Sequence, residues 1–401
     1  MPNKVIKLGY RAYQKAFMAA EYFFDWSEPE LLKGPGAVKK LPSLVKSKGI
    51  SSVLVVTDKG LMGLHILDSL FEKLDELNIK YTVFDGVQPN PSIENIEEAR
   101  RLYLKNGCEG IIAFGGGSPM DCAKAAGARV ANPNTTVSQM RGELKIRKKL
   151  PPFFAVPTTA GTGSETTLAA VVTNMQTHEK YAINDPKLRP KYAVLDPELT
   201  TGLPQKITST TGMDALTHAV EAFIGLSGTA STDDYARKAT KLIFENIETA
   251  YNDGKNLEAR ENMLVASFYA GMAFTRAYVG YVHAIAHNLG GIYGTPHGLA
   301  NAVILPHVLE YYGETAHKKL AELADIVGLE GDTDAAKATA FINAVKQFNK
   351  NMNIPEHFDF IQDKDIPTIV ERALKEGNPL YPVPKIMDKK DCEAVVKKIK
   401  G

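Results

Sequence analysis

The sequence is poor in cysteine, in tryptophan and in net charge, and each shortage excludes a class of protein. Its 401 residues include 3 cysteines and 1 tryptophan. The cysteines, Cys108, Cys122 and Cys392, have no CxxC spacing. This argues against a disulfide framework or a cysteine-type zinc site and is typical of a reducing compartment. Lys+Arg 47 against Asp+Glu 46 leaves a formal charge of +1, so nothing indicates binding to nucleic acid or to an anionic membrane.

Long apolar runs are also missing. No run approaches the roughly 18 apolar residues of a membrane span. The segment 1–24 carries basic residues, but Tyr, Gln, Lys and Glu interrupt its apolar positions, so we do not expect a cleavable signal peptide. These absences favour a cytoplasmic protein without a membrane or nucleic-acid partner.

Short β-branched runs alternate with amphipathic helical segments from residue 51 to about residue 200. This alternation predicts a mainly parallel sheet that is covered by helices. The expected strands are 51–58, 80–85, 110–115, 152–158, 169–174 and 191–196. Because binding residues in such sheets follow the carboxyl ends of the strands, the segments after these runs are the places to look for a site.

A glycine-rich segment, GGGSPMDCAK (115–124), follows the third expected strand. Gly116 and Gly117 would allow backbone N–H groups to approach an anion. Ser118 is the expected N-cap of the next helix, and Asp121 follows it by three residues. The helix N-terminus adds about half a positive charge, so a diphosphate is the natural ligand. The alternative is a tight turn without a ligand, because the motif is neither a Walker loop nor GxGxxG.

A second polar loop, PTTAGTGSETT (157–167), follows the fourth expected strand. Thr158, Thr159, Thr162 and Ser164 offer donors for phosphate and ribose. Alone the loop could be merely polar, but two such loops at one sheet edge favour a dinucleotide. Asp58 ends the first strand, where an acid would bind a ribose hydroxyl and repel a 2′-phosphate, which favours NAD over NADP.

Beyond Gly202 the strand pattern stops. Amphipathic helices are expected at 231–253, 256–274, 316–329 and 333–352. We therefore expect an α/β Rossmann-like domain over residues 1–204 and an all-helical domain over residues 205–401, with Leu203–Pro204 as the hinge. A nucleotide bound to the first domain would face the second across a cleft.

Three of the nine histidines lie within residues 282–297, VHAIAHNLGGIYGTPH. His283 and His287 are four residues apart and would share one face of a helix. Neutral imidazole is the commonest protein ligand for a divalent transition metal. The alternative is that these histidines make separate hydrogen bonds in the core or at the surface.

Glycines in the same stretch predict a turn that places His297 near His283 and His287. Gly290 and Gly291 should loosen or end the helix. The turn at Gly294 and Pro296 can then bring His297 back toward the pair.

The segment GMDALTHAVEAF (212–223) repeats the four-residue spacing with Asp214 and His218. An acid four residues before a histidine can simply support a helix. Together with the histidines above, however, this pair forms a set of one oxygen and several nitrogen ligands. Such a set suits Fe(II) or Zn(II), and ligand type does not choose between them.

In their order and spacing, these motifs resemble the iron-containing (group III) alcohol dehydrogenase family, which shares its two-domain fold with glycerol dehydrogenase and dehydroquinate synthase. The resemblance runs from about residue 30 to the C-terminus and includes HAIAHNLGGIYGTPHGLANAVILPHV. It implies a dehydroquinate synthase-like fold, an NAD(P)-binding Rossmann-like domain and a helical domain with one divalent metal, usually iron and sometimes zinc. The implied reaction is NAD-linked hydride transfer between a small primary alcohol or diol and its aldehyde.

The resemblance also implies roles for individual residues. Asp214, His218, His283 and His297 would be the metal ligands. His287 would lie near the nicotinamide and the substrate, where it would relay the alcohol proton. The implied dinucleotide contacts are Asp58, Asn90, Gly117, Ser118, Thr158, Thr159, Thr167, Lys180, Leu199 and Gly202. Gly116, Asp121 and Thr162 of the two loops complete the predicted dinucleotide site.

Two parts of the chain depart from the family pattern. Arg276 and Tyr278 stand where many relatives carry smaller polar residues. Arg276 is either a structural ion-pair partner or a contact for a carboxylate or phosphate on the substrate. The first thirty residues also fit poorly and are expected to form an extra interface element in a homodimer or larger homo-oligomer.

Three alternative functions remain open from the sequence. A dehydroquinate-synthase-like lyase would need a basic phosphate-binding set, of which the chain offers little beyond Arg276. A glycerol-dehydrogenase-like enzyme would act on a polyol and typically use zinc with fewer ligands. A non-enzymatic protein with a structural metal would leave the two loops without a purpose.

Overall fold

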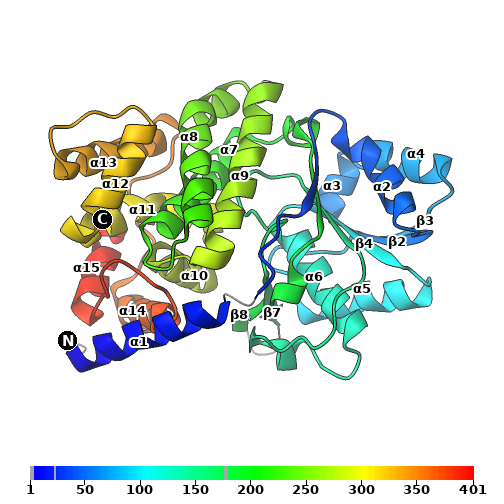
Figure 1. Cartoon of the computed structure of the whole chain (residues 1–401), viewed down its shortest axis with the longest axis horizontal. Coiled ribbons are helices and arrows are strands. Elements are labelled where there is room, and N and C mark those ends of the chain that lie inside the picture. The colour runs from blue at the N-terminus through cyan, green and yellow to red at the C-terminus, as the bar shows by residue number, and fades with distance from the viewer. Residues whose placement is uncertain (1–3, 22–23, 176–178) are drawn as a thin grey trace. The chain divides into compact units, whose positions relative to one another are not determined.

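The computed structural model describes residues 4–21, 24–175 and 179–401. The chain divides between Gly202 and Leu203 into two compact units, which we call the α/β unit (Asp25–Gly202) and the helical unit (Leu203–Gly401 with the N-terminal helix). Figure 1 labels many of the elements of each. The division lies near the predicted boundary at residue 204. The N-terminal helix, which the prediction placed in the first domain, groups with the helical unit. No helix among the described residues is long and apolar enough to cross a membrane.

The α/β unit is built on a six-stranded sheet with the order β1-β9-β6-β4-β2-β3. All its neighbouring strands pair in parallel. Every residue of β2, β4 and β6 is buried, as expected of strands covered on both faces. The strands are β1 (Glu30–Lys33), β2 (Ser52–Val56), β3 (Lys80–Phe84), β4 (Gly110–Gly115), β6 (Phe153–Pro157) and β9 (Tyr192–Leu195).

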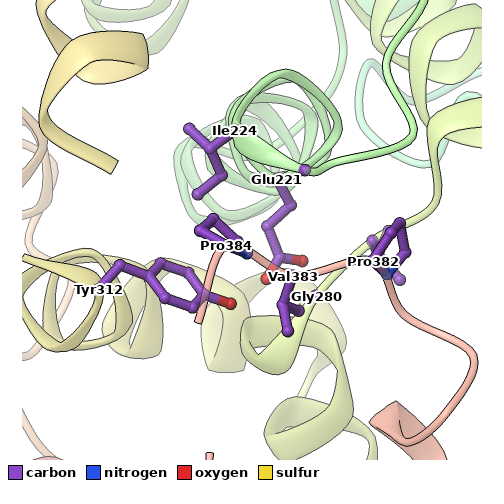
Figure 2. A pocket seen from close by; sticks show the side chains of 9 residues that line it. Glu221, Ile224, Gly280, Tyr312, Pro382, Val383 and Pro384 are labelled. Atoms are coloured by element: carbon purple, nitrogen blue, oxygen red, sulfur yellow. The ribbon is translucent and has the colours of Figure 1, made fainter. Parts of the chain in front are cut away.

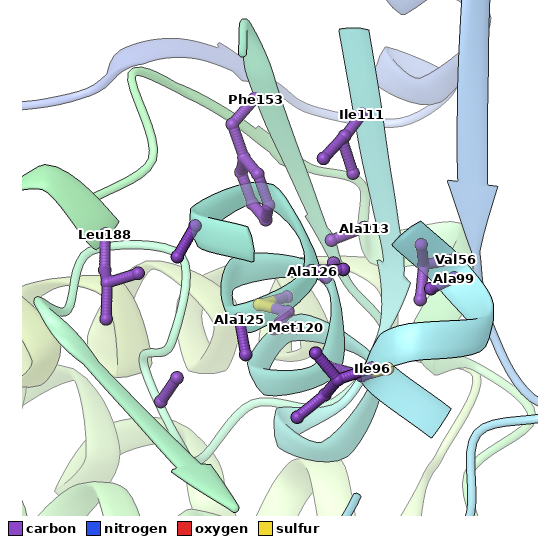
Figure 3. Close-up of a cluster of buried hydrophobic side chains, with 14 of the residues drawn as sticks. Val56, Ile96, Ala99, Ile111, Ala113, Met120, Ala125, Ala126, Phe153 and Leu188 are labelled. Carbon is purple, nitrogen blue, oxygen red and sulfur yellow. The ribbon is translucent and has the colours of Figure 1, made fainter. Parts of the chain in front are cut away.

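Helices cover both faces of this sheet. Val55 of β2 packs with Leu41 of α2 (Leu41–Ser47) and Leu70 of α4 (Asp68–Glu76). Its neighbour Leu54 points to the opposite face and belongs to a cluster with α5 (Ile93–Lys105) and α6 (Gly117–Ala131), part of which is drawn in Figure 3. This alternation follows the two-residue period of a strand.

The expected strand at 169–174 forms, but in a different sheet from the one predicted. β7 (Ala169–Asn174) pairs antiparallel with β8 (Glu179–Asn184), which pairs in parallel with β5 (Gly142–Glu143). Buried and partly buried residues alternate along most of β7. This one-sided burial is typical of an antiparallel strand and distinguishes β7 from the fully buried strands of the main sheet.

The helical unit surrounds the central helix α7, which is buried at every residue from Gly212 to Ile224. α8, α9 and α11 pack against it. Polar side chains in such a helix require partners, because an unpaired buried polar group is costly. The helices are α7 (Gln205–Ile224), α8 (Ala230–Asn252), α9 (Leu257–Ala277), α10 (Tyr281–Tyr293), α11 (His297–Tyr312), α12 (Glu314–Ile326), α13 (Asp334–Asn351), α14 (Ile366–Gly377) and α15 (Lys389–Lys400).

The N-terminal helix α1 (Lys4–Glu21) is tied to the segment 379–384, which follows α14 (Figure 1). Gln14 Nε2 donates hydrogen bonds to the carbonyl oxygens of Pro379 at 2.8 Å and Tyr381 at 2.9 Å. Arg11 Nη2 donates to the carbonyl oxygen of Val383 at 2.7 Å. These bonds explain why α1 belongs to the helical unit.

Candidate active site

Three helices of the helical unit bring together the four residues that the family resemblance implies as metal ligands. Asp214 and His218 come from α7, His283 from α10, and His297 is the first residue of α11. One side-chain N or O atom from each lies within 4.8 Å of all the others. His297 is partly exposed, and the other three residues are buried.

The turn between α10 and α11 returns His297 to this cluster. Gly294 ends α10 in the left-handed region, with φ 69°, and Pro296 is the N-cap of α11. The turn was predicted. Gly290 and Gly291 were predicted to loosen or end the helix, and they do not end it, because α10 continues to Tyr293. Gly290 even accepts the capping hydrogen bond from Gly294 N at 3.1 Å, and glycine within a helix costs only about 1 kcal/mol.

Glu221 supports His283 from outside the cluster. Its Oε2 lies 2.6 Å from His283 Nδ1, and its Oε1 accepts a hydrogen bond from Val282 N at 2.8 Å. Figure 2 shows Glu221 beside Gly280, in a small pocket lined also by Pro382 and other residues of the segment 379–384. Glu221 was not predicted from the sequence, although it stands seven residues after Asp214 and therefore on the same face of α7.

The protonation of this pair follows from its burial. Burial raises the pKa of Glu221 to about 7, while backbone N–H groups oppose that rise. Burial, together with the neighbouring histidines, lowers the pKa of His283 well below its usual value. His283 is therefore neutral, with its proton on Nδ1 facing the acceptor Glu221 and a lone pair on Nε2. Nε2 is the nitrogen that faces Asp214 Oδ1, at 3.9 Å.

Asn301 contacts three of the four residues of the cluster. Its Nδ2 donates to Asp214 Oδ1 at 2.6 Å. The same nitrogen lies 3.1 Å from His283 Nε2 and 3.2 Å from His297 Nε2. Asn301 is buried and follows His297 by one turn of α11, a spacing that the sequence analysis overlooked.

The cluster fits a divalent cation. Ligand bonds of about 2.0–2.2 Å place any two ligands of one ion at most about 4.4 Å apart, which is close to the 4.8 Å within which the four atoms lie. Asp214 Oδ1 lies 3.5 Å from His297 Nε2 and 3.9 Å from His283 Nε2. Three imidazoles and one carboxylate, without a thiolate, suit Fe(II) or Zn(II).

His287 lies beside the cluster and is not one of its four members. Its ring stacks on that of His297, with 5.1 Å between ring centroids. Its Nδ1 lies 2.7 Å from Glu376 Oε1. His287 is partly exposed, so it combines proximity to the cluster with access to a ligand.

In the α/β unit, the candidate nucleotide residues follow three adjacent strands. Asp58 comes after β2, the glycines 115–117 after β4, and the loop 157–167 after β6. β3 lies on one side of β2 and β4 on the other, so the strand order reverses between β2 and β4. Ligands of open α/β sheets bind at the carboxyl ends of the strands at such a reversal.

The two loops pack directly against each other. A Cβ atom on Gly116 would lie 3.3 Å from Thr159 Oγ1, and one on Gly117 would lie 3.2 Å from Thr162 Cγ2. Thr158 N donates to the carbonyl oxygen of Gly115 at 3.1 Å. Glycine is therefore favoured at these positions by the close approach of the second loop as well as by any ligand.

The predicted N-cap was wrong by two residues. α6 begins at Gly117 with Gly116 as its N-cap, and no side chain caps it. Ser118 lies inside the first turn, where its Oγ accepts a hydrogen bond from Asn90 N at 3.2 Å. Lys180 Nζ donates to Asn90 Oδ1 at 2.6 Å. Because no side chain caps α6, its first backbone N–H groups can bind an anion. Ser118, Asn90 and Lys180, three of the implied contact residues, lie beside them.

Two of the predicted dinucleotide contacts, Asp121 and Thr167, make hydrogen bonds to other residues of the α/β unit. Thr167 Oγ1 accepts a hydrogen bond from the buried Lys124 Nζ at 2.9 Å, and Ser164 Oγ lies 3.0 Å from the same nitrogen. Asp121 accepts hydrogen bonds from Ser164 Oγ at 3.3 Å and Val171 N at 3.1 Å. These bonds show that Asp121 and Thr167 brace the second loop. The role of Lys124 was not predicted from the sequence.

Asp58 and the residues after β9 lie at the same edge of the sheet. Asp58 is the N-cap of α3 (Lys59–Gly63), and its Oδ1 accepts a hydrogen bond from Leu61 N at 2.9 Å. Leu199 packs in the core cluster on the α2 face, and Gly202 is exposed. The side chain that was expected to select NAD therefore also caps a helix.

The two residues that depart from the family pattern lie at the end of α9. Arg276 is partly buried in its last turn, and Tyr278 is its C-cap with φ 65°. The Tyr278 ring meets Phe17 of α1 edge-on, with 6.1 Å between ring centroids. Tyr278 therefore belongs to the contact between α9 and α1.

Comparison with known proteins agrees with this geometry. The sequence of this chain matches two protein-family models. Residues 29–197 match the family iron-containing alcohol dehydrogenase, and residues 208–400 match the C-terminal domain of the Fe-containing alcohol dehydrogenase family. The 1,3-propanediol dehydrogenase of Citrobacter freundii is 41% identical over 364 residues, which cover 88% of this chain and 93% of that protein.

Solved structures show the same fold. The crystal structure of a 1,3-propanediol oxidoreductase has a TM-score of 0.91 and 38% identity, covering 94% of this chain and 100% of that one. The sulfoacetaldehyde reductase of Bifidobacterium kashiwanohense, solved in complex with NAD⁺, has a TM-score of 0.85 and 28% identity, covering 94% and 99%. The chain is therefore a member of the iron-containing alcohol dehydrogenase family, a metal-dependent enzyme that transfers hydride between NAD(H) and an alcohol or aldehyde.

Proposed function

We propose that this enzyme oxidises small primary alcohols and diols with NAD⁺, and reduces the corresponding aldehydes, using Fe²⁺ held by Asp214, His218, His283 and His297. The observation that carries the proposal is the convergence of these four side chains within 4.8 Å. The preference for short diols is supported by the 41% identity to a 1,3-propanediol dehydrogenase. The complete four-ligand set argues against a glycerol-dehydrogenase-like site.

In the proposed reaction the cation and NAD⁺ would supply polarisation and hydride acceptance, and the protein would supply proton transfer. Oxidation of RCH₂OH by NAD⁺ gives RCHO, NADH and one proton, so the site must accept a hydride from carbon and a proton from oxygen. When bound, the cation supplies Lewis-acid polarisation of the substrate oxygen, and NAD⁺ supplies the hydride acceptor. His287 takes the hydroxyl proton at Nε2 and returns it in the reverse direction.

The α/β unit would bind the dinucleotide. The uncapped start of α6, with Gly116 and Gly117, would bind the diphosphate together with the second loop. Asp58 would accept a hydrogen bond from the ribose hydroxyl and so select NAD. The remaining proposed contacts are Asn90, Ser118, Thr158, Thr159, Thr162, Lys180, Leu199 and Gly202, while Asp121 and Thr167 would act through the loop that they brace.

The test is metal reconstitution. Protein stripped with a chelator is reloaded anaerobically with Fe(II) or Zn(II), and NADH formation is followed with ethanol, 1-propanol, 1,3-propanediol and glycerol. We expect metal-dependent turnover that is highest with Fe(II) and with 1,3-propanediol or a primary alcohol. Full activity of the stripped protein would overturn the metal role. Activity confined to glycerol with Zn(II) would favour the glycerol-dehydrogenase alternative.

A further inference from the structure

We infer that Glu376 is a positioning residue that fixes the orientation and tautomer of His287, an inference that rests on the proposed role of His287. Glu376 Oε1 lies 2.7 Å from His287 Nδ1. The hydroxyl of Tyr381 donates to the same oxygen at 2.9 Å. His287 thus meets an acceptor whose own position is fixed by a second hydrogen bond.

The chemistry of the pair selects one tautomer. An ionised carboxylate can only accept hydrogen bonds, so His287 Nδ1 must carry the proton. The lone pair then stays on Nε2, the nitrogen that can accept a proton from a substrate hydroxyl. Without Glu376, the ring can rotate or carry its proton on Nε2, and in either arrangement it cannot act as a base toward the substrate.

The fold holds Glu376 close to the helix that carries His287. Glu376 lies in the last turn of α14, one residue before Gly377. A Cβ atom on Gly377 would lie 2.9 Å from Cε1 of Tyr281, the first residue of α10. The hydroxyl of Tyr281 also donates to Asn378 Oδ1 at 3.0 Å. The end of α14 is therefore packed against the start of α10.

The segment 379–384 completes the support. It contributes Tyr381, and α1 holds it through the hydrogen bonds of Gln14. Leu226 N, just beyond α7, donates to the carbonyl oxygen of Pro382 at 2.7 Å. The same segment lines the pocket around Glu221 in Figure 2. The segment 379–384 thus lies beside both Glu221 and Glu376, the carboxylates that are hydrogen-bonded to His283 and His287.

Glu376 can be changed without opening the core. Its side chain is 31% exposed and that of His287 is 35% exposed. Partly exposed ion pairs contribute little to stability, so variants at this position should fold and retain their metal. This permits a test of positioning that is not confused with loss of structure.

The first test reads the tautomer directly. Long-range ¹H–¹⁵N correlation spectra of ¹⁵N-histidine-labelled protein resolve the ring nitrogens of its 9 histidines, and H287A assigns the His287 signals. We expect proton-bearing Nδ1 and unprotonated Nε2 in the wild type, and a mixture or reversal in E376A. An unchanged His287 pattern in E376A overturns the inference, whether or not the enzyme is active on alcohols.

The second test is kinetic, on the metal-loaded enzyme. E376A should lower kcat about 10- to 100-fold, as loss of an orienting carboxylate does in comparable sites, while KM for alcohol and bound metal stay the same. E376Q keeps an acceptor oxygen, and because a neutral hydrogen bond is about half as strong as a charge-assisted one, it should retain most of the activity. Glu371 is an exposed glutamate of the same helix. E371Q is therefore the matched control and should behave as wild type.

Comparison with H287A separates this inference from the proposed function. If H287A is impaired and E376A adds no further loss to it, the two residues act together and the inference is supported. If H287A is impaired but E376A is fully active, or if their losses multiply, Glu376 does not act through His287 and the inference fails. If H287A itself is fully active, the proposed role of His287 fails, and this inference fails with it. Should E376A lose its metal, Y381F gives the decision, because it keeps the carboxylate and removes only the hydroxyl that holds it.

Discussion

Glu221 Oε2 accepts a hydrogen bond from His283 Nδ1 at 2.6 Å, and this contact determines which nitrogen of His283 faces the four-residue cluster. The carboxylate also accepts a backbone hydrogen bond from Val282 at 2.8 Å. It therefore connects the end of α7 to the start of α10 through two acceptor contacts. Metal-binding histidines are commonly held in this way by a carboxylate behind the ring.

Replacing Glu221 should weaken metal binding. E221A leaves two buried donors without their acceptor, and we expect a 10- to 100-fold loss of metal affinity, roughly the usual cost of such a change. E221Q should be no better, since its amide group presents a donor to either the Val282 N–H or the His283 N–H. Affinity is measured by titrating stripped protein with Fe(II) or Zn(II). E165Q, which changes another buried glutamate, should bind metal normally, and wild-type affinity in E221A would contradict the proposed support.

Removing a proposed ligand should have a larger effect than removing His287. D214A and H283A should lose both the metal and all turnover, because each takes away one of four donors and leaves the others crowded and unpaired. H287A should keep the metal but turn over about 10²- to 10⁴-fold more slowly, the usual contribution of a general base. Metal content after desalting and NADH formation distinguish the two classes. One equivalent of metal retained in H283A would contradict the assignment.

Asp58 provides a test of cofactor choice. D58S keeps a side-chain oxygen that can cap α3 but removes the charge that would repel a 2′-phosphate. We expect kcat/KM for NADP⁺ relative to NAD⁺ to rise by about tenfold or more, since two like charges near a protein surface repel by a few kcal/mol. The exposed acid Asp75 of the same unit offers the control D75S, for which the ratio should not change. An unchanged ratio in D58S would remove Asp58 from cofactor selection.

Lys124 gives the α/β unit a pH-dependent stability. Burial lowers the pKa of Lys124 to about 8 from the usual 10.5. Between these values the unfolded chain still binds the proton that the folded chain has released, so folding stability rises with pH across this window. Below about pH 8 both states are protonated, and this contribution is constant.

The comparison with K124M isolates this effect. The difference in unfolding free energy between wild type and K124M should increase by up to ~3 kcal/mol from pH 8 to pH 10.5. Fluorescence of Trp26, the 1 tryptophan of the chain, reports unfolding of this unit, since Arg189 lies 5.6 Å from the Trp26 ring centroid. A constant difference across the window would contradict the burial of a charged lysine.

Much of the fold follows from local sequence patterns. The runs that became β2, β4 and β6 are apolar throughout, and continuous burial of this kind is what a parallel sheet requires. Asp214 with His218 and His283 with His287 could be paired because a four-residue spacing fixes which face of a helix they share. Turn chemistry at Gly294 then indicated the direction from which His297 arrives.

The supporting residues could not be found in that way. Glu376 lies 89 residues from His287, and no local period connects them, since only the packing of α14 on α10 brings them together. In the sequence, nothing distinguishes Lys124 from an exposed helical lysine. It is buried because the second loop packs over it. Glu221 was the exception, because its place on the Asp214 face of α7 was readable from spacing alone.

The hydrogen bond from Gln14 to Pro379 joins residues 365 positions apart, and it has a consequence for biosynthesis. While the ribosome makes the rest of the protein, α1 lacks the surface that it will bind, whereas Asp25–Gly202 already contains its complete sheet. The α/β unit can therefore mature first. Docking of α1 must come late, after the segment 379–384 has emerged, so the support of Glu376 and His287 is among the last parts of the molecule to be assembled.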